Sequence, residues 1–343
     1  MHQIQNTLFV LSQRAFLRLQ TETVKVEVGG VERLRVPLLH VSSVVVFGNV
    51  MLSPALIEAL AEQGSSIVWL GGEGRFVGRL QRGVTGNVLL RRAQHAVSTV
   101  ADAAAKVAAS FVAGKLHNAR SVLLRAAREA RNDDTAAALR AAADVSASSL
   151  RGLDGATELD SIRGFEGNAA RAYFGAMNHL VRVDDAQFHI TGRTRRPPRD
   201  RTNALLSFAY ALLLTDCVAA LESVGLDPQV GFLHGIRPGR PGLALDLMEE
   251  FRPLVADRLV LSLINRRQVT AKDFDERPGG AIWLGEEARR TMVSEYQTRK
   301  REEITHPLLG NKMPWSLVPM VQARLLARHL RGDAECYVPF VPR

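Results

Sequence analysis

Cysteine is scarce in this chain of 343 residues, which has only Cys217 and Cys336, and neither lies in a C-x-x-C motif or a Cys/His cluster. This spacing excludes a disulfide framework and leaves a structural zinc site without obvious ligands. No apolar run reaches the roughly 18 residues that a membrane helix needs. The amino terminus lacks the cationic start and apolar run of a signal peptide. We therefore expect a soluble, cytosolic protein.

Positive charge is abundant: 44 Lys and Arg residues outnumber 35 Asp and Glu residues, which gives a formal net charge of +9. Hydrophobic residues make up 46% of the chain, so it has enough apolar side chains to fold. The excess charge predicts a polyanionic partner, most simply nucleic acid. A basic surface without such a partner is the alternative.

The first part of the chain predicts strands. Val24, Val26 and Val28 alternate with polar residues, as in a half-buried strand, and Gly29-Gly30 is a plausible hairpin turn. Ser53-Pro54 predicts the start of a helix that Gly64 ends. The predicted strands cover residues 8–11, 15–19, 23–28, 44–47, 67–70 and 76–80, with a second hairpin across Gly71-Gly72-Glu73-Gly74.

From about Asn87 the texture changes to long Ala-rich stretches, and such residues are strong helix formers. Asp134 is a candidate N-cap between two of these helices. Sustained heptads are absent, so packed bundle helices are favoured over a coiled coil. Because the length exceeds what one core usually supports, the predicted fold class is α+β. A small β-rich, β-sandwich-like domain (1–86) precedes a larger all-α domain (87–343).

Three segments carry candidate chemistry. Glu166 lies in S-I-R-G-F-E-G-N-A-A-R-A-Y-F, where glycines and alanines leave room beside its carboxylate; a solvated surface charge is the alternative. His234 ends the apolar, strand-like run Val230-Gly231-Phe232-Leu233-His234; a hydrogen-bonded structural histidine is the alternative.

The third segment is a predicted helix, L-A-L-D-L-M-E-E-F-R-P, beginning at Leu243. Asp246 lies three residues before Glu249 and four before Glu250, so these carboxylates share or nearly share a face. Neighbouring carboxylates repel unless a cation lies between them. Arg252 is the structural candidate for that cation and a divalent metal is the functional one. Periodicity alone does not choose between Glu249 and Glu250.

One histidine and two or three carboxylates make a plausible site for Mg²⁺ or Mn²⁺. Such an ion polarises a phosphodiester and stabilises oxygens that gain charge. Two basic loops lie near these residues in the sequence, and Arg side chains match phosphate oxygens. A solvated charged surface is the alternative for each. The candidate DNA contacts are Arg193, Arg195, Arg196, Arg199, Arg237 and Arg240.

These motifs in their order resemble CRISPR-associated protein one, the adaptation endonuclease–integrase. The resemblance is carried by R-G-F-E-G-N-A-A-R-A-Y-F, by R-R-P-P-R-D-R-T-N-A-L-L-S-F-A-Y-A-L-L, and by G-F-L-H followed by L-A-L-D-L-M-E-E-F-R-P. It runs along nearly the whole chain and includes the junction from Arg82 to Gln94. The overall sequence pattern is closest to that of subtype I-C. One departure is Arg199-Asp200-Arg201, which replaces a less basic P-x-D-P run.

The resemblance implies that the N-terminal domain mediates dimerisation and that the helical domain holds the active site. The family's metal ligands fall on Glu166, His234 and Glu249, with Asp246 as a supporting acid. Its members form homodimers, assemble with CRISPR-associated protein two, and join the 3′-hydroxyl ends of a short DNA duplex to CRISPR repeat borders.

The resulting hypothesis is a metal-dependent transesterification in antiviral defence, with Mg²⁺ or Mn²⁺ as cofactor. With water as the nucleophile the same site is an endonuclease. Two alternatives stay open: a nuclease that acts on branched DNA, and a non-catalytic DNA-binding scaffold.

Overall fold

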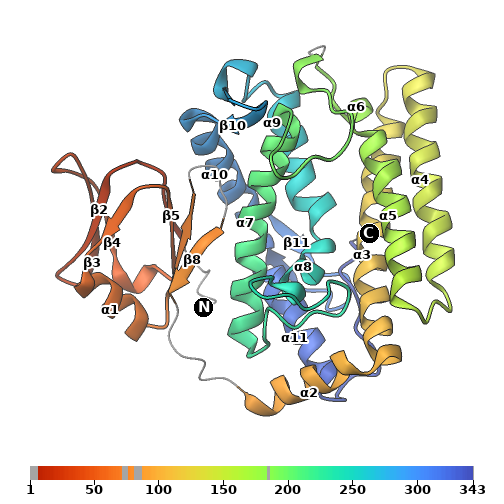
Figure 1. The fold of residues 1–343 in the computed structure, drawn as a ribbon, viewed down its shortest axis with the longest axis horizontal. Helices are drawn as coiled ribbons and strands as arrows, with labels where there is room; N and C mark the ends of the chain where they lie inside the picture. Colours follow the sequence, from red (N-terminus) through yellow and green to blue (C-terminus); the bar gives the residue numbers. More distant parts are fainter. Residues whose placement is uncertain (1–6, 72–75, 81–86, 184–185, 343) are drawn as a thin grey trace. The chain divides into compact units, whose positions relative to one another are not determined.

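The computed structural model describes residues 7–71, 76–80, 87–183 and 186–342. The chain divides into two compact units, Met1–Val84 with Leu284–Ser294, and Thr85–Trp283 with Glu295–Arg343 (Figure 1). The predicted domain boundary at residue 86 lies outside the described residues, as do most of the predicted hairpin turn at 71–74 and the first part of the Arg82–Gln94 junction.

The N-terminal unit is built from two four-stranded sheets, ordered β1-β5-β7-β8 and β4-β3-β2-β6, and one helix. Val10, Val44 and Ile67 of one sheet and Leu17 and Val24 of the other share a single buried core. The strand-rich, sandwich-like start of the predicted fold class is therefore confirmed. The elements are β1 (Thr7–Val10), β2 (Ala15–Gln20), β3 (Thr23–Val28), β4 (Val31–Pro37), β5 (Ser43–Phe47), β6 (Val50–Leu52), α1 (Pro54–Glu62), β7 (Ser66–Leu70) and β8 (Phe76–Leu80).

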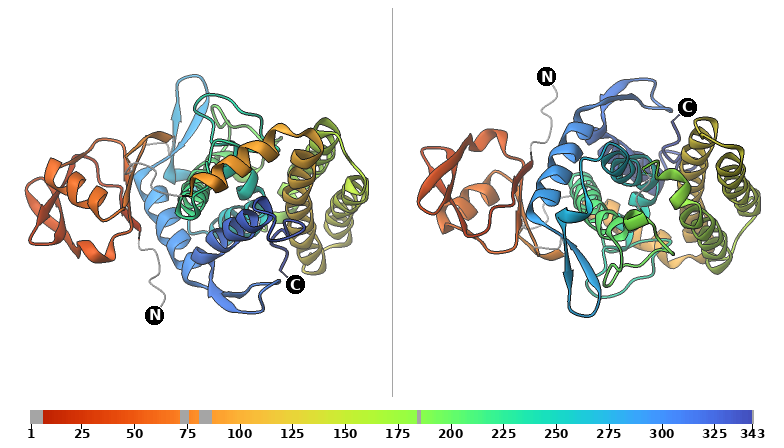
Figure 2. Two further views of the ribbon diagram at one scale, coloured as in Figure 1. Left: turned by 90° about the horizontal axis from the view of Figure 1, so that it is seen from below. Right: turned by 90° about the horizontal axis from the view of Figure 1, so that it is seen from above.

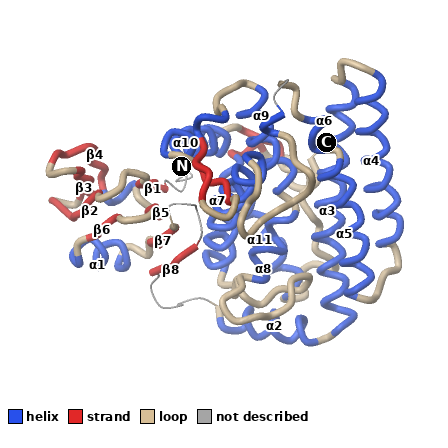
Figure 3. The backbone as a smooth tube through the Cα atoms, turned by 45° about the horizontal axis from the view of Figure 1, so that its top comes forward, coloured by secondary structure: helices blue, strands red, loops and turns tan. Residues whose placement is uncertain are grey.

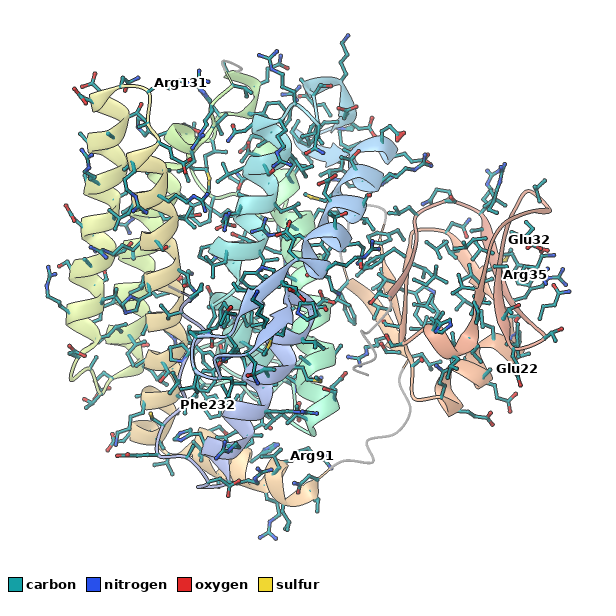
Figure 4. The ribbon with its side chains drawn as sticks, turned by 180° about the vertical axis from the view of Figure 1, so that it is seen from behind. Glu22, Glu32, Arg35, Arg91, Arg131 and Phe232 are labelled. Carbon is teal, nitrogen blue, oxygen red and sulfur yellow. The ribbon has the colours of Figure 1, made fainter. Side chains whose placement is uncertain are left out.

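Local sequence signals account for these elements. β3 and β4 pair as an antiparallel hairpin whose turn residues, Gly29 and Gly30, both have positive φ, as predicted. Ser53 caps α1 by accepting a hydrogen bond from the Leu56 amide. Gly64, at φ +80°, follows the end of that helix. Figure 4 labels Glu32 and Arg35, which form an ion pair on β4.

Helices dominate the chain after residue 87, and α3, α4 and α5 lie side by side in every view (Figure 2). The helices are α2 (Val88–Thr99), α3 (Ala101–Arg128), α4 (Asp133–Leu153), α5 (Leu159–Gly175), α6 (Met177–Leu180), α7 (Arg201–Val224), α8 (Gly242–Glu249), α9 (Arg258–Asn265), α10 (Glu286–Arg301) and α11 (Val318–Leu330). A π-helical segment, η3 (Arg252–Asp257), joins α8 to α9. Short 3₁₀ turns are η1 (Leu38–His40), η2 (Ala186–Phe188), η4 (Ala271–Asp273) and η5 (Trp315–Leu317).

Two short two-stranded sheets interrupt these helices, a feature that the expectation of an all-α domain did not include (Figure 3). They are β9 (Phe274–Arg277) with β10 (Ala281–Leu284), and β11 (Glu303–Thr305) with β12 (Lys312–Pro314). Each strand has only three or four residues, too few for the alternation that predicts a strand.

One local prediction differs from the structure. The N-cap of α4 is Asn132, which accepts a hydrogen bond from the Thr135 amide, and Asp134 lies inside the helix. The Ala-rich helix α3 begins at Ala101, after a 99° bend between α2 and α3. Val100 has extended backbone angles there, so it belongs to neither helix.

The long helix α7 differs from the expectation that no apolar segment reaches the length of a membrane helix. By length and composition α7 is apolar enough to cross a membrane, although no apolar run of that length was expected from the sequence. The bent α2–α3 pair meets the same criteria if it is taken as one span. Scattered polar residues such as Ser207 and Asp216 interrupt the apolar run of α7 in the sequence. α7 packs against α8, α11 and η3 with Leu205, Leu206 and Phe208 buried, which is the environment of a core helix.

Candidate active site

The structure brings Glu166 of α5 and Glu249 of α8 together on either side of Lys115 on α3, and His234 of the loop before α8 lies beside Glu249. The Lys115 ammonium donates a hydrogen bond to Glu166 Oε1 and lies 2.7 Å from Glu249 Oε2. His234 Nε2 is 4.0 Å from Glu249 Oε1. The three residues predicted to act together thus meet although they come from distant parts of the chain.

Asp246 shapes the loop that carries His234. Its Oδ2 accepts the backbone amides of Phe232 (2.6 Å) and Leu233 (3.0 Å), and its Oδ1 accepts the amide of His234 (2.9 Å). Oδ1 also lies 2.6 Å from His234 Nδ1. Since the amides are turned toward one carboxylate, the run from Val230 is an irregular loop and the predicted strand is wrong. With Nδ1 engaged, His234 presents Nε2 to the site.

Three other contacts hold the same loop. The Gln94 side chain on α2 donates to the carbonyls of Asp227 and Val230, each at 2.8 Å. Arg163 on α5 donates to the Leu233 carbonyl at 2.8 and 3.1 Å. Gly231 permits the close approach to α8, because a Cβ there would lie 2.6 Å from the Gly242 carbonyl carbon and 2.8 Å from Asp246 Oδ2. Phe232, labelled in Figure 4, is buried at the centre of this loop.

Cations control the ionisation of Glu249. Burial alone would raise its pKa, but the charges of Arg252, Lys115 and His234 outweigh burial and lower the pKa to about 2. Arg252 lies 3.4 Å from Glu249 Oε1 and stacks on the Tyr210 ring at 4.8 Å. Conversely, the carboxylates of Glu249 and Glu166 raise the pKa of Lys115 against the effect of its own burial. The site therefore holds charged partners at neutral pH.

Glu250 faces a different environment from its neighbour. It accepts hydrogen bonds from Tyr337 Oη, from Gln322 Nε2 (3.0 Å) and from the Phe340 amide (2.7 Å). Burial raises its pKa to about 7 despite these donors. The carboxylate that sequence periodicity could not separate from Glu249 thus anchors the C-terminal segment to α8 and α11, and only Glu249 faces His234.

A buried network lies behind Arg252. Asp257 Oδ1 accepts a hydrogen bond from Tyr210 Oη at 2.7 Å, and Tyr210 is the ring on which Arg252 stacks. Burial raises the pKa of Asp257 to about 6, and the Tyr210 hydrogen bond opposes this shift. The network fixes the face of Arg252 opposite to Glu249.

The charges of the two basic loops act on one another. The pKa of Arg240 is lowered by burial and by the charges of Arg237, Arg163 and Arg195, so these four guanidinium groups lie close enough to interact. Arg196, Arg199 and Arg237 are exposed, as a DNA contact requires, and Arg199 also donates to the Gly279 carbonyl. These arginines therefore stay candidates for contact with DNA.

Arg193 differs from the other candidate DNA contacts. It is half-buried and donates to Asn203 Oδ1 at 2.7 Å and to Ser207 Oγ at 3.1 Å, and it faces the Tyr210 ring at 5.3 Å. Its donors are committed within the fold, so the structure favours a structural role for it. Asp200, in the run that departs from the family pattern, caps α7 by accepting the Asn203 amide at 2.7 Å.

The donor set fits a hard divalent cation. In the described part of the chain no three His, Cys, Asp or Glu side chains are grouped at metal-ligand spacing. The Lys115 ammonium lies between Glu166 and Glu249. The buried Oε2 of Glu249 lies within ion-pair distance of Lys115 but forms no well-aligned hydrogen bond with a described donor. Mg²⁺ and Mn²⁺ suit this set of donors, which consists of two carboxylates and an available imidazole nitrogen at a position that needs positive charge.

Sequence reasoning missed Lys115, Arg163 and Gln94. Each acts on a partner far along the chain: Lys115 and Glu166 are 51 residues apart, and Gln94 and Asp227 are 133 apart. Lys115 lies in an Ala-rich helix with no local motif around it. Gln94 ends the family-like junction, which was the only available signal.

Comparison with known proteins identifies the family. A family model described as CRISPR associated protein Cas1 matches residues 8–298. The chain belongs to the Cas1 family. It is 52% identical over 343 residues to the CRISPR-associated endonuclease Cas1 1 of Moorella thermoacetica, with 100% of both chains covered. The family and the endonuclease class predicted from the sequence are therefore confirmed, whereas the subtype stays a prediction.

Solved structures share the Cas1 fold. A Cas1 protein from Thermotoga maritima superposes with a TM-score of 0.81 at 27% identity, covering 97% of this chain and 99% of that one. A chain of a Cas6-RT-Cas1–Cas2 complex superposes with a TM-score of 0.85 at 22% identity, covering 99% of this chain and 36% of that one. At that identity the second match establishes the fold alone.

The anchoring role of Glu250 predicts a stability effect. Tyr337→Phe keeps the ring contact with Phe111, whose centroid is 5.0 Å away, but removes a donor to a buried carboxylate. We expect a loss of about 1–3 kcal/mol in the free energy of unfolding, measured by urea denaturation. Val338→Ala, at an exposed position in the same segment, is the control. Equal stability of the two variants would contradict the anchoring role.

The raised pKa of Asp257 predicts a pH dependence. The folded carboxyl, with its pKa near 6 against a usual value of 3.8, binds a proton more tightly than the unfolded one. Its contribution is complete below about pH 3.8 and is lost as pH rises through 6. Relative to Asp257→Asn, the wild-type free energy of unfolding should fall by on the order of 3 kcal/mol between pH 4 and pH 7. If the free energies of unfolding of the wild type and of Asp257→Asn, measured in urea, change in parallel with pH, the raised pKa of Asp257 is contradicted.

Proposed function

We propose that this chain is the metal-dependent integrase of CRISPR spacer acquisition, which joins the 3′-hydroxyl ends of a short DNA duplex to the borders of a CRISPR repeat. The observation that carries the proposal is that Glu166 and Glu249 share one cation position, with His234 beside Glu249, in a Cas1-family chain. The fit of this donor set to a hard cation is the reason to assign the metal to these three residues.

A divalent ion held by Glu166, His234 Nε2 and Glu249 supplies Lewis-acid stabilisation of the phosphate oxygens when it is bound. Mg²⁺ and Mn²⁺ both suit this donor set. Asp246 keeps Nδ1 of His234 engaged and so fixes the ring orientation and the free nitrogen. Arg252, through its ion pair with Glu249 and its stacking on Tyr210, holds the carboxylate in place.

The reaction exchanges one phosphodiester for another. The 3′-oxygen of the donor strand attacks the phosphorus, a new P–O bond forms, and the 3′-oxygen of the cut target strand leaves with a proton. The number of phosphodiester bonds is unchanged, so no nucleotide cofactor is consumed. Arg195, Arg237 and Arg240, whose charges act on one another, are the residues proposed to pair with backbone phosphates of the DNA. Attack by water at the same position gives the endonuclease activity.

The partners of this reaction follow from the fold and surface. A chain with the same fold occurs in a complex that contains Cas2, so Cas2 is the proposed protein partner. A homodimer is proposed through the N-terminal unit, residues 1–86, with 87–343 as the catalytic domain. The edge strand β8 exposes Phe76, Val77 and Leu80, and exposed apolar edge strands pair readily with a second chain. The proposed location is the prokaryotic cytoplasm, where the CRISPR array lies.

A strand-transfer assay tests the proposal. A labelled duplex with free 3′-hydroxyls is mixed with a repeat-bearing plasmid, the small partner protein, and Mg²⁺ or Mn²⁺. Glu166→Gln, His234→Ala and Glu249→Gln should each abolish joining, because each removes a proposed ligand. Asp246→Asn should weaken metal binding about 10- to 100-fold, as loss of a group that orients a ligand does. Glu158→Gln, at an exposed position beside the start of α5, is the matched control.

The products separate the competing functions. Label joined at repeat borders by the wild-type protein, and lost in the ligand variants, supports the integrase. Cut DNA without joining favours a nuclease for branched DNA. Metal-independent binding with a steep salt dependence and no product favours a scaffold. Normal joining by folded His234→Ala protein would overturn the site assignment.

A further inference from the structure

Lys115 is a buried cation placed between the two carboxylates that the proposed function assigns to a metal. Its ammonium contacts both Glu166 and Glu249, and only 12% of its side chain is exposed. The three groups come from separate helices, α3, α5 and α8, so the lysine links all three. Two carboxylates held this close repel each other unless a cation lies between them, and the Lys115 ammonium lies in that position.

The same position cannot hold two cations. A divalent ion bound to both Glu166 and Glu249 would lie within a few ångströms of the Lys115 ammonium, and like charges at such distances repel strongly in a poorly solvated site. Arg252, 3.4 Å from Glu249 on its other oxygen, already adds a further positive charge. Metal binding therefore requires Lys115 to leave.

The structure offers Lys115 a place to go. Lys115 lines a cavity of about 30 Å³ together with the small side chains of Ala169 and Ala170 and with Arg195. This volume is sufficient for at least one water molecule, which is close to the size of an ammonium group. Arg195 belongs to the basic loop proposed to contact DNA, so an ammonium group in this cavity would lie beside a side chain that is proposed to pair with a phosphate.

We propose that Lys115 is a built-in counter-cation that competes with the divalent metal for Glu166 and Glu249, and that it makes metal binding depend on DNA. Without DNA, a displaced Lys115 leaves two carboxylates for a cavity lined by Asp257, which is already hydrogen-bonded to Tyr210, and by the positively charged Arg252 and Arg195. The metal then binds weakly. With DNA, a backbone phosphate beside Arg195 gives the ammonium a new partner, so displacement costs less. Metal and DNA then bind cooperatively, each raising the affinity of the other by the same factor. This inference rests on the proposed metal site.

Mn²⁺ binding tests the inference, measured by isothermal titration calorimetry or by electron paramagnetic resonance on the full-length protein with and without a short DNA duplex. In the wild type, DNA should tighten Mn²⁺ binding roughly tenfold or more, within the usual range of coupling between sites. Lys115→Met should bind Mn²⁺ more tightly than the wild type in the absence of DNA, and DNA should add much less. A purely structural role for Lys115 would not produce tighter binding.

Controls keep the outcome clear. Lys106→Met changes an exposed lysine of the same helix and should bind Mn²⁺ as the wild type does. Lys115→Met leaves Glu166 and Glu249 facing each other, so its melting temperature without metal should fall and Mn²⁺ should raise it more than in the wild type. If that variant does not fold, Lys115→Gln, whose neutral amide can still donate to Glu249, is used in the same measurements.

The failures are distinguishable. Equal or weaker Mn²⁺ affinity in folded Lys115→Met or Lys115→Gln, with unchanged coupling to DNA, overturns the role of Lys115 and leaves the metal site intact. Absence of Mn²⁺ binding to the wild type under both conditions, or undiminished binding to Glu249→Gln, overturns the metal site itself and with it the proposed function.

Discussion

The carboxylate of Asp246 is the contact on which the candidate site depends. It accepts three successive backbone amides from Phe232 to His234 and the imidazole Nδ1 as well. One buried side chain therefore shapes the loop, orients the ring and joins it to the helix that carries Glu249. A carboxylate that accepts this many donors gains most where water is excluded, and Asp246 has no exposed surface.

Adjacent residues on that helix show how environment divides two identical carboxylates. Glu249 faces Lys115, Arg252 and His234, and these charges lower its pKa to about 2. Glu250 points into a buried region of neutral donors, where burial raises its pKa to about 7. The ionised Glu249 is suited to bind a cation. Glu250, which accepts hydrogen bonds from Tyr337 and the C-terminal segment, is suited to stabilise the fold. The π-helical segment that follows, a form frequent at functional sites, then turns Arg252 back toward Glu249.

The candidate site is a balance of buried charges supplied by separate helices. The cations Lys115 and Arg252 face the anions Glu166 and Glu249, and each group would be costly to bury without the others. Buried hydrogen bonds, such as that between Tyr210 and Asp257, continue this polar network into the core. Any ion that enters the site has to replace a charge already present, which is why binding at this position is tied to movement of a side chain.

The sequence by itself determined the features that depend on neighbours within a few residues. Alternation identified β3, and Ser53 and Gly64 marked the ends of α1. Composition separated the strand-rich start from the helices. The order of the motifs pointed to Glu166, His234 and Glu249, and to the family to which the chain belongs.

Only the tertiary structure decided which side chains meet. Lys115 has no local motif because its partners lie on α5 and α8. The separate role of Glu250 is visible only in its contacts with the C-terminal segment. The run ending at His234 has the composition of a strand, yet Asp246 draws its amides into a loop. The physical reason is the same in each case. The local sequence pattern sets the conformational preference of the backbone. Buried charges and backbone amides, however, need partners, and these come from residues far away in the sequence that packing brings close.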